Sequence, residues 1–271
     1  MELRRIETNG TALNVAVGGD GPAVLLLHGW PHTWRLWSLA APLLAPDHRV
    51  VAPDLRGLGD SARVPDRFDA VTGADDMLGV LDALGIDRAH VVAIDAGVPA
   101  AFLLGARHPG RVRRLVLMEA LLPGLPGGFA APPWWFGFHA VPGLAETVLE
   151  GHEAEYVDWL LEAGTHGGEG APADVRDAFV RAYTGRDALR CGFGYYRAAA
   201  QNADAVRAAG RLGVPTVAVG AAAVGDRLYR QLEPIAEHLD GEVVGDSGHL
   251  VPLDRPDVVA ALVRGQGVTS G

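Results

Sequence analysis

The sequence has no lysine, a single cysteine and no long hydrophobic run. All 23 basic residues are arginine, and 33 acidic residues outnumber them, which gives a formal net charge of −10 at pH 7. Nucleic acids and anionic membrane surfaces bind proteins through basic patches, so this charge argues against both as partners. The lone Cys191 excludes an internal disulfide bond and leaves no cysteine cluster for a metal ion.

No segment is apolar over the length needed to cross a bilayer, and the first residues, Met-Glu-Leu-Arg-Arg, lack the hydrophobic region of a signal peptide. We therefore expect a cytoplasmic protein. Its 271 residues are 49% apolar, enough to bury one full core. This size fits a single α/β domain with an insertion.

Short apolar strands alternate with helical patterns over much of the chain. An opening pair, 3–8 and 12–17, flanks Asn9-Gly10, a hairpin signal. Further strands are expected at 23–27, 49–52, 90–94, 115–118, 214–219 and 241–244, with a last helix after Pro256. Strands that alternate with helices predict a mostly parallel sheet with flanking helices, an α/β fold.

The alternation of strands and helices stops between residues 121 and 209. A Pro/Gly-rich segment, 123–128, leads there into helical stretches at 144–150, 155–163 and 173–183. We predict a core domain made of residues 1–120 and 210–271, with a helical cap at 121–209.

Asp95 ends an apolar strand in the run Val-Val-Ala-Ile-Asp-Ala-Gly. In a nucleophile elbow, a strand turns so sharply into a helix that only small residues fit two positions before and after the nucleophile; here these are Ala93 and Gly97. The elbow usually carries serine. An aspartate would instead attack saturated carbon and form an ester on its own side chain. The alternative is an ordinary Asp that caps the following helix.

Three other motifs lie at strand ends. His28-Gly29-Trp30-Pro31 follows the strand 23–27, where a backbone N–H can help to form an oxyanion hole, although the segment could also be a simple turn. The glycine-punctuated segment 54–61 is interpreted as scaffold. His249 lies in a Gly-bearing loop, 245–252, between the last strand and the last helix.

In this order, the motifs resemble the epoxide hydrolase and dehalogenase branch of the α/β-hydrolases over essentially the whole chain. Members of that branch look like His-Gly-x-Pro, Asp-x-Arg-Gly-x-Gly-x-Ser, a Gly-His-Asp-x-Gly elbow, a helical cap and a late Gly-His. The resemblance implies the α/β-hydrolase fold, with Asp95 as nucleophile, His249 as general base and the Trp30 and Ala96 N–H groups as oxyanion hole. Ala93-Ile94 departs from the usual Gly-His, and we expect altered packing there.

Two residues are candidates for the acid that orients His249. In many α/β-hydrolases the acid follows the strand after the cap, where this chain has Asp226; in a subgroup with some epoxide hydrolases and the fluoroacetate dehalogenases, it ends the strand before the cap, where this chain has Glu119. We favour Glu119, because surface solvation poorly explains an acid directly after an apolar strand. Asp226 also makes an ordinary helix N-cap.

Two aromatic segments of the cap, 134–139 and 194–197, resemble those that supply hydrogen-bond donors to the substrate in that subgroup. Neighbouring helical residues point about 100° apart, so one of two adjacent tyrosines should face the site, and the similarity favours Tyr196. Trp135 stands where relatives carry a His donor. Further candidate substrate contacts are Trp134, Phe136, His139 and Tyr195. The alternative for these rings is core packing of the cap.

An opening epoxide needs a hydrogen bond and then a proton, and a tyrosine can give both. The residues with which the dehalogenases bind a substrate carboxylate or a halide are missing here. Ala96 to Pro99 stand in place of the arginines of fluoroacetate dehalogenases and the tryptophan of haloalkane dehalogenases.

The sequence thus predicts an epoxide hydrolase in which Asp95 attacks while Tyr196 and Trp135 hold the oxygen. No metal or organic cofactor is implied. We expect a monomer or homodimer acting on a small apolar, aromatic or polycyclic epoxide from secondary metabolism. The alternatives are a hydrolytic dehalogenase and a catalytically inactive hydrolase-fold binding protein.

Overall fold

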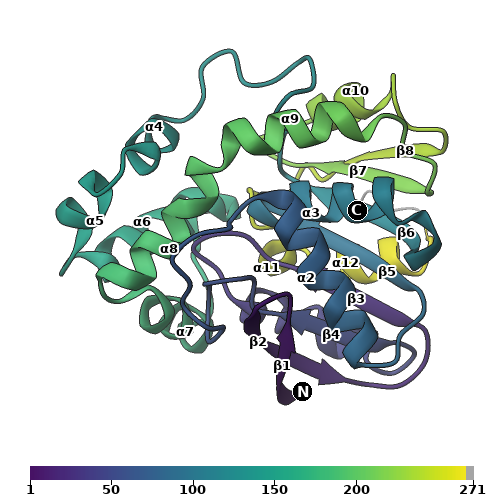
Figure 1. Cartoon of the computed structure of the whole chain (residues 1–271), viewed down its shortest axis with the longest axis horizontal. Helices are drawn as coiled ribbons and strands as arrows, with labels where there is room; N and C mark the ends of the chain where they lie inside the picture. Colours follow the sequence, from purple (N-terminus) through teal and green to yellow (C-terminus); the bar gives the residue numbers. More distant parts are fainter. Residues whose placement is uncertain (267–271) are drawn as a thin grey trace.

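The computed structural model describes residues 1–266, in which eight strands form one sheet (Figure 1). The strands are β1 (Glu2–Thr8), β2 (Thr11–Gly18), β3 (Ala23–Leu27), β4 (Arg49–Pro53), β5 (Ala89–Ile94), β6 (Val112–Met118), β7 (Thr216–Gly220) and β8 (Leu239–Val243). Their order is β1-β2-β4-β3-β5-β6-β7-β8. β2 pairs antiparallel with both β1 and β4, and the remaining neighbours are parallel, so the predicted mostly parallel sheet is confirmed.

The hairpin between β1 and β2 forms at Asn9-Gly10, as predicted. Both residues have positive φ, 44° and 74°, the combination that a type I′ turn requires. This turn suits the right-handed twist of the two strands and sets the register from Thr8 opposite Thr11 to Glu2 opposite Val17.

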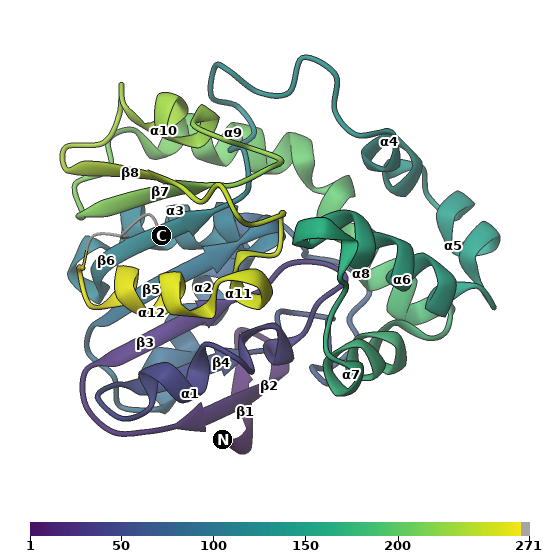
Figure 2. The same ribbon diagram turned by 180° about the vertical axis from the view of Figure 1, so that it is seen from behind.

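Helices cover both faces of the sheet. The α-helices of residues 1–266 are α1 (Ala41–Leu44), α2 (Ala70–Ala83), α3 (Val98–Arg107), α4 (Trp134–Ala140), α5 (Leu144–Leu149), α6 (Glu153–Gly164), α7 (Ala173–Tyr183), α8 (Arg186–Arg197), α9 (Ala199–Ala209), α10 (Arg227–Leu232), α11 (Val251–Asp254) and α12 (Pro256–Val263). α2, α3 and α10 lie on one face (Figure 1), and α1, α11 and α12 lie on the other (Figure 2). None of the helices in residues 1–266 is long and apolar enough to span a membrane.

Strand β3 shows how the sheet divides the core into two layers. Leu25 and Leu27 pack into the cluster under α2 and α3, whereas Val24 and Leu26 pack into the cluster under α1 and α12. All four side chains are fully buried. Apolar residues at every position are typical of a parallel strand covered on both faces.

Within the described residues, the segment between β6 and β7 contains helices and no strand. Helices α4 to α8 lie beside the sheet, beyond one end of its strands (Figure 1). α9 packs instead against α2 and α3 of the core. The domain boundaries at 121 and 209 stay a prediction, and the packing of α9 indicates that the projecting part ends near Ala198.

Candidate active site

Asp95 ends β5 and begins the turn into α3. Its φ is 52°, in the left-handed region that residues other than glycine rarely adopt. Two glycines make room for this turn. A Cβ on Gly29 would lie 2.1 Å from Asp95 Oδ1, and a Cβ on Gly97 would lie 2.7 Å from the His28 carbonyl oxygen. The turn thus holds an aspartate, with 22% of its side chain exposed, on the strained backbone of a nucleophile elbow.

Backbone N–H groups point at the Asp95 carboxylate. His28 is fully buried, and its Nε2 accepts a hydrogen bond from the Leu55 N–H at 3.1 Å. Its Nδ1 therefore carries the proton and donates to the Gly29 carbonyl oxygen at 2.7 Å. This fixed ring holds the loop in which the Trp30 N–H donates to Asp95 Oδ1 at 3.0 Å. The backbone N–H of Ala96, the next residue, also acts on this carboxylate and lowers its pKa. Both N–H groups expected in an oxyanion hole therefore favour the charged form of this carboxylate.

His249 lies between two carboxylates. Its Nε2 is 3.4 Å from Asp95 Oδ2, and its Nδ1 is 3.3 Å from Glu119 Oε2. Burial lowers the pKa of His249, but the hydrogen bonds to both carboxylates outweigh burial and raise the pKa to about 10. Burial raises the pKa of Asp95, and the His249 imidazolium together with the Ala96 N–H outweighs that effect and lowers it. At neutral pH this pair is therefore a carboxylate and an imidazolium.

Glu119 follows β6 as Asp95 follows β5, and it also has a positive φ, 47°. The residue is 2% exposed. Its Oε1 accepts hydrogen bonds from the backbone N–H groups of Ala221 and Val224, which leaves Oε2 to face His249. Because one oxygen is anchored in the scaffold, the other is held in place for the imidazole.

Asp226, the alternative acid, lies at the surface. It precedes α10 without a side-chain cap bond, its side chain is 51% exposed, and it pairs with Arg230 at 2.5 Å. The loop between β7 and α10, where an acid of the alternative arrangement would lie, gives its backbone N–H groups to Glu119 instead. The geometry favours Glu119 as the partner of His249.

Aromatic rings from α4 and α8 pack around Trp30, whose N–H donates to Asp95, and form an aromatic cluster there. The Trp30 ring meets those of His139 and Tyr196 edge-on, with centroids 4.9 and 6.1 Å away, and the Phe136 and Tyr196 centroids are 5.3 Å apart. Burial and the negative charge of Asp95 raise the pKa of Tyr196 well above its usual value, so the phenol keeps its proton. Of the cap residues expected from the sequence, Tyr196, Phe136 and His139 come together here.

Trp135 meets this cluster at Phe136, with ring centroids 6.3 Å apart, and Trp134 packs against Trp135. Trp134 is 61% exposed, and the Trp135 ring packs edge-on against those of Trp134 and Trp159. Trp135 and His139 share one face of α4, because they are four residues apart, but Trp135 is a full turn away. The geometry therefore favours His139 over Trp135 beside Tyr196, and it leaves Trp134 outside the group.

Tyr156 on α6 also belongs to the aromatic cluster, although it is not among the site residues expected from the sequence. Its hydroxyl oxygen is 2.8 Å from His139 Nε2. The spacing of apolar residues along α6 shows which residues share a helix face. Tyr156 and Leu160, one turn apart, pack against the cluster under α2 and α3, whereas Val157 and Leu161 join the cluster on the opposite face of the sheet. Tyr156 thus lies on the helix face that contacts His139.

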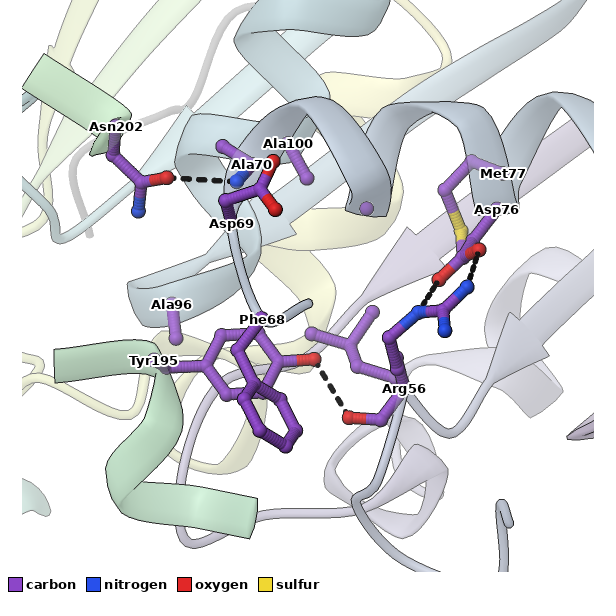
Figure 3. Close-up of a pocket in the computed structure, with 12 residues that line it drawn as sticks. Arg56, Phe68, Asp69, Ala70, Asp76, Met77, Ala96, Ala100, Tyr195 and Asn202 are labelled. Atoms are coloured by element: carbon purple, nitrogen blue, oxygen red, sulfur yellow. Dashed lines mark hydrogen bonds and ion pairs between the residues drawn. The ribbon is translucent and has the colours of Figure 1, made fainter. Parts of the chain in front are cut away.

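Tyr195 points into a separate small cavity (Figure 3). Its hydroxyl donates to the Arg56 carbonyl at 2.9 Å, and with Ala96 it lines a cavity of about 20 Å³, room for one water molecule. Among the described residues, neither Asp95 nor His249 lines this cavity. Tyr195 is therefore committed to the scaffold, which leaves Tyr196 as the tyrosine of this pair that faces the site.

The acidic and histidine side chains of the site bind one another rather than converge on a common point. In residues 1–266, no group of three or more His, Cys, Asp or Glu side chains is arranged to hold a metal ion.

Comparisons with known proteins agree with this geometry. A family model described as alpha/beta hydrolase fold matches residues 22–256. The soluble epoxide hydrolase of Corynebacterium sp. (strain C12) is 28% identical over 263 residues, which cover 93% of this chain and 92% of that protein. The fluoroacetate dehalogenase of Burkholderia sp. is 35% identical over 125 residues, 44% of this chain and 41% of that enzyme.

A solved structure, of the epoxide hydrolase CorEH without ligand, is similar with a TM-score of 0.89 at 27% identity, and the match covers 97% of each chain. These findings confirm the predicted fold and the resemblance to both groups of enzymes.

Proposed function

The chain belongs to the α/β-hydrolase family, and we propose that it is an epoxide hydrolase that works through an ester on Asp95. The observation that carries the proposal is an aspartate at the elbow with a phenol, Tyr196, in the aromatic cluster around Trp30. A carboxylate attacks saturated carbon, and a phenol gives the proton that an opening epoxide needs. The full-length relative named soluble epoxide hydrolase supports this reading.

In the first half-reaction, Asp95 Oδ2 forms a bond to one epoxide carbon. The carbon–oxygen bond of the ring breaks, and its electron pair passes to the oxygen. Tyr196 gives its proton to that oxygen. His139, with its ring centroid 4.5 Å from that of Tyr196, takes the donor place that the sequence suggested for Trp135. Asp95 Oδ1 stays with the Trp30 N–H and becomes the carbonyl oxygen of the ester.

In the second half-reaction, water attacks the carboxyl carbon of the ester. His249, oriented by Glu119, takes the proton of that water. The Trp30 and Ala96 N–H groups stabilise the oxyanion that forms on Oδ1. Collapse of this intermediate releases the diol and restores the Asp95 carboxylate.

The protons balance over the cycle. The free enzyme holds a proton on His249, whose pKa is about 10. Tyr196 gives a proton to the epoxide oxygen, and the proton that His249 then releases restores the phenol. Neutral His249 regains a proton when water attacks, and the second hydroxyl of the diol takes the other proton of that water.

Hydrolytic dehalogenation is the second candidate, because one relative is a fluoroacetate dehalogenase. The residues after the nucleophile, Ala96 to Pro99, offer neither a charged side chain for a carboxylate nor an indole for a halide. An inactive binding protein is disfavoured by the assembled Asp95, His249 and Glu119. The rings of Trp30, Phe136 and Phe193 around the phenol suit an apolar, aromatic or polycyclic epoxide.

Replacement of Tyr196 by Phe tests the epoxide chemistry. The change removes the proton donor and keeps the ring, so alkylation of Asp95 by an aromatic epoxide should slow by a factor of about a hundred to a thousand, the usual cost of one preorganised donor. Hydrolysis of any ester formed should be nearly unchanged. Pre-steady-state kinetics of ester formation and of ester hydrolysis measure both rates.

Tyr195→Phe is the matched comparison, because its hydroxyl bonds to the Arg56 carbonyl on the other side of the elbow. It should affect alkylation far less. A change of less than about tenfold in Tyr196→Phe, or about 1.4 kcal/mol, would remove Tyr196 from the mechanism. Turnover of haloalkanoates but of no epoxide would favour the dehalogenase.

A further inference from the structure

His139, which is buried, and Tyr156, which is half-buried, form a polar pair inside the aromatic cluster. His139 Nε2 is 2.8 Å from the Tyr156 hydroxyl oxygen. The His139 ring is fully buried and stacks on Phe193, with centroids 4.4 Å apart. Its other nitrogen, Nδ1, is buried and has no hydrogen-bond partner among the described residues. A buried polar atom without a partner costs free energy, and a bound ligand can supply the partner.

Both members of the pair are uncharged at neutral pH. Burial, helped by the positive charge of Arg197, lowers the pKa of His139 to about 3. Burial raises the pKa of the Tyr156 phenol above its usual value. In a neutral imidazole, one nitrogen carries a proton and the other accepts a hydrogen bond. The contact between His139 and Tyr156 can therefore exist in two forms.

The two forms differ in how many polar groups they satisfy. If the Tyr156 hydroxyl donates to Nε2, the phenol proton and the Nε2 lone pair are both used, and the ring proton is on Nδ1. If Nε2–H donates to the phenol oxygen instead, the phenol proton and the bare Nδ1 both lack a partner among the described residues. The first form leaves fewer polar groups without a partner among the described residues and is therefore favoured.

We propose that Tyr156 fixes His139 as the Nδ1–H tautomer and so makes Nδ1–H the second donor to the epoxide oxygen, beside the Tyr196 hydroxyl. This inference rests on the proposed function, because the partner of Nδ1–H is the substrate oxygen. The ring centroids of His139 and Tyr196 are 4.5 Å apart, so the two donors belong to adjoining side chains. Tyr156 acts through His139 and is a positioning residue.

The tautomer can be measured without substrate, by ¹⁵N NMR of the imidazoles at pH 7. The chain has ten histidines, so the His139 signals are assigned by their loss in His139→Asn. We expect a protonated Nδ1 and an unprotonated Nε2 in the wild type, and a loss of this preference in Tyr156→Phe. A protonated Nε2 in the wild type would overturn the inference.

Kinetics test the consequence for catalysis. Tyr156→Phe should slow alkylation of Asp95 about tenfold or more, in the range of weakened general acid catalysis, and leave ester hydrolysis unchanged. Asn at position 139 keeps a side-chain N–H near the place of Nδ1 and has no tautomers. In that background, adding Tyr156→Phe should change alkylation by less than about twofold. Equal effects of Tyr156→Phe in both backgrounds would mean that it acts through packing alone.

Tyr229→Phe is the control for loss of a phenol, because Tyr229 lies on α10, outside the cap. It should change neither the His139 signals nor alkylation. If no epoxide ever modifies wild-type Asp95, the proposed function fails while the NMR result still stands. If the ester forms but His139 carries its proton on Nε2, only this inference fails.

Discussion

His249→Gln is expected to stall the protein as an ester on Asp95. A carboxylate needs no base to attack, and the Trp30 and Ala96 N–H groups still stabilise the Asp95 carboxylate when His249 is replaced, so alkylation should proceed. Glutamine cannot take a proton from water, and ester hydrolysis should slow by a factor of about 10² to 10⁴. Intact-protein mass spectrometry after mixing with an epoxide should show a mass increase equal to the substrate.

His238→Gln is a matched control, because His238 is exposed on the core surface. It should turn over without accumulating the ester. A folded His249→Gln protein that binds substrate and stays unmodified would show that His249 is needed before the ester forms. The proposal that His249 acts only in ester hydrolysis would then be wrong.

The two carboxylates around His249 give a physical reason for the proposed mechanism to use this base only in the second step. In the free protein they raise its pKa to about 10, and a protonated imidazole cannot take a proton from water. Ester formation removes the charge of Asp95, one of the two groups that raise this pKa. The pKa of His249 must therefore fall once the ester has formed, which makes the base available when water has to be activated.

Glu119→Gln should slow ester hydrolysis by up to about 10⁴-fold, the scale seen when the acid of a catalytic triad becomes an amide. The amide keeps the size of the side chain but no longer stabilises the imidazolium, and its NH₂ group favours the wrong tautomer of His249. Alkylation should be much less affected. Single-turnover kinetics separate the two steps.

Asp226→Asn is the matched comparison for Glu119→Gln. Asp226 is exposed and paired with Arg230, so its loss should cost about 0.5 kcal/mol of stability or less, and ester hydrolysis should be unchanged. The opposite pattern, with slow hydrolysis in Asp226→Asn and normal hydrolysis in Glu119→Gln, would move the orienting acid to the loop after β7.

The elbow and the strands could be predicted from the sequence because their signals are local. Asp95 has small residues two positions away on each side and an apolar strand before it, and both features can be read from seven consecutive residues. The preference for Glu119 had a similar basis, since surface solvation poorly explains an acid that directly follows the buried residues 115–118. The hairpin at Asn9-Gly10 depends on two adjacent residues.

The cap was harder to predict, because its contacts are set by how far each helix extends. Trp135 and His139 have the same helical phase, and the sequence could not tell which turn of α4 reaches Tyr196. Tyr156 was missed for a related reason. Its role depends on a contact with His139, 17 residues away on another helix, and the periodicity of α6 shows only which residues share a face.

The most direct test of the covalent mechanism is a single turnover of the wild-type protein in heavy-oxygen water, followed by mass spectrometry of the peptide that contains Asp95 and of the diol. Because water attacks the carboxyl carbon of the ester, the label should enter the Asp95 carboxylate and the first diol should be unlabelled. Label in the diol of the first turnover, with none in Asp95, would mean that water attacks the epoxide directly and would contradict the mechanism.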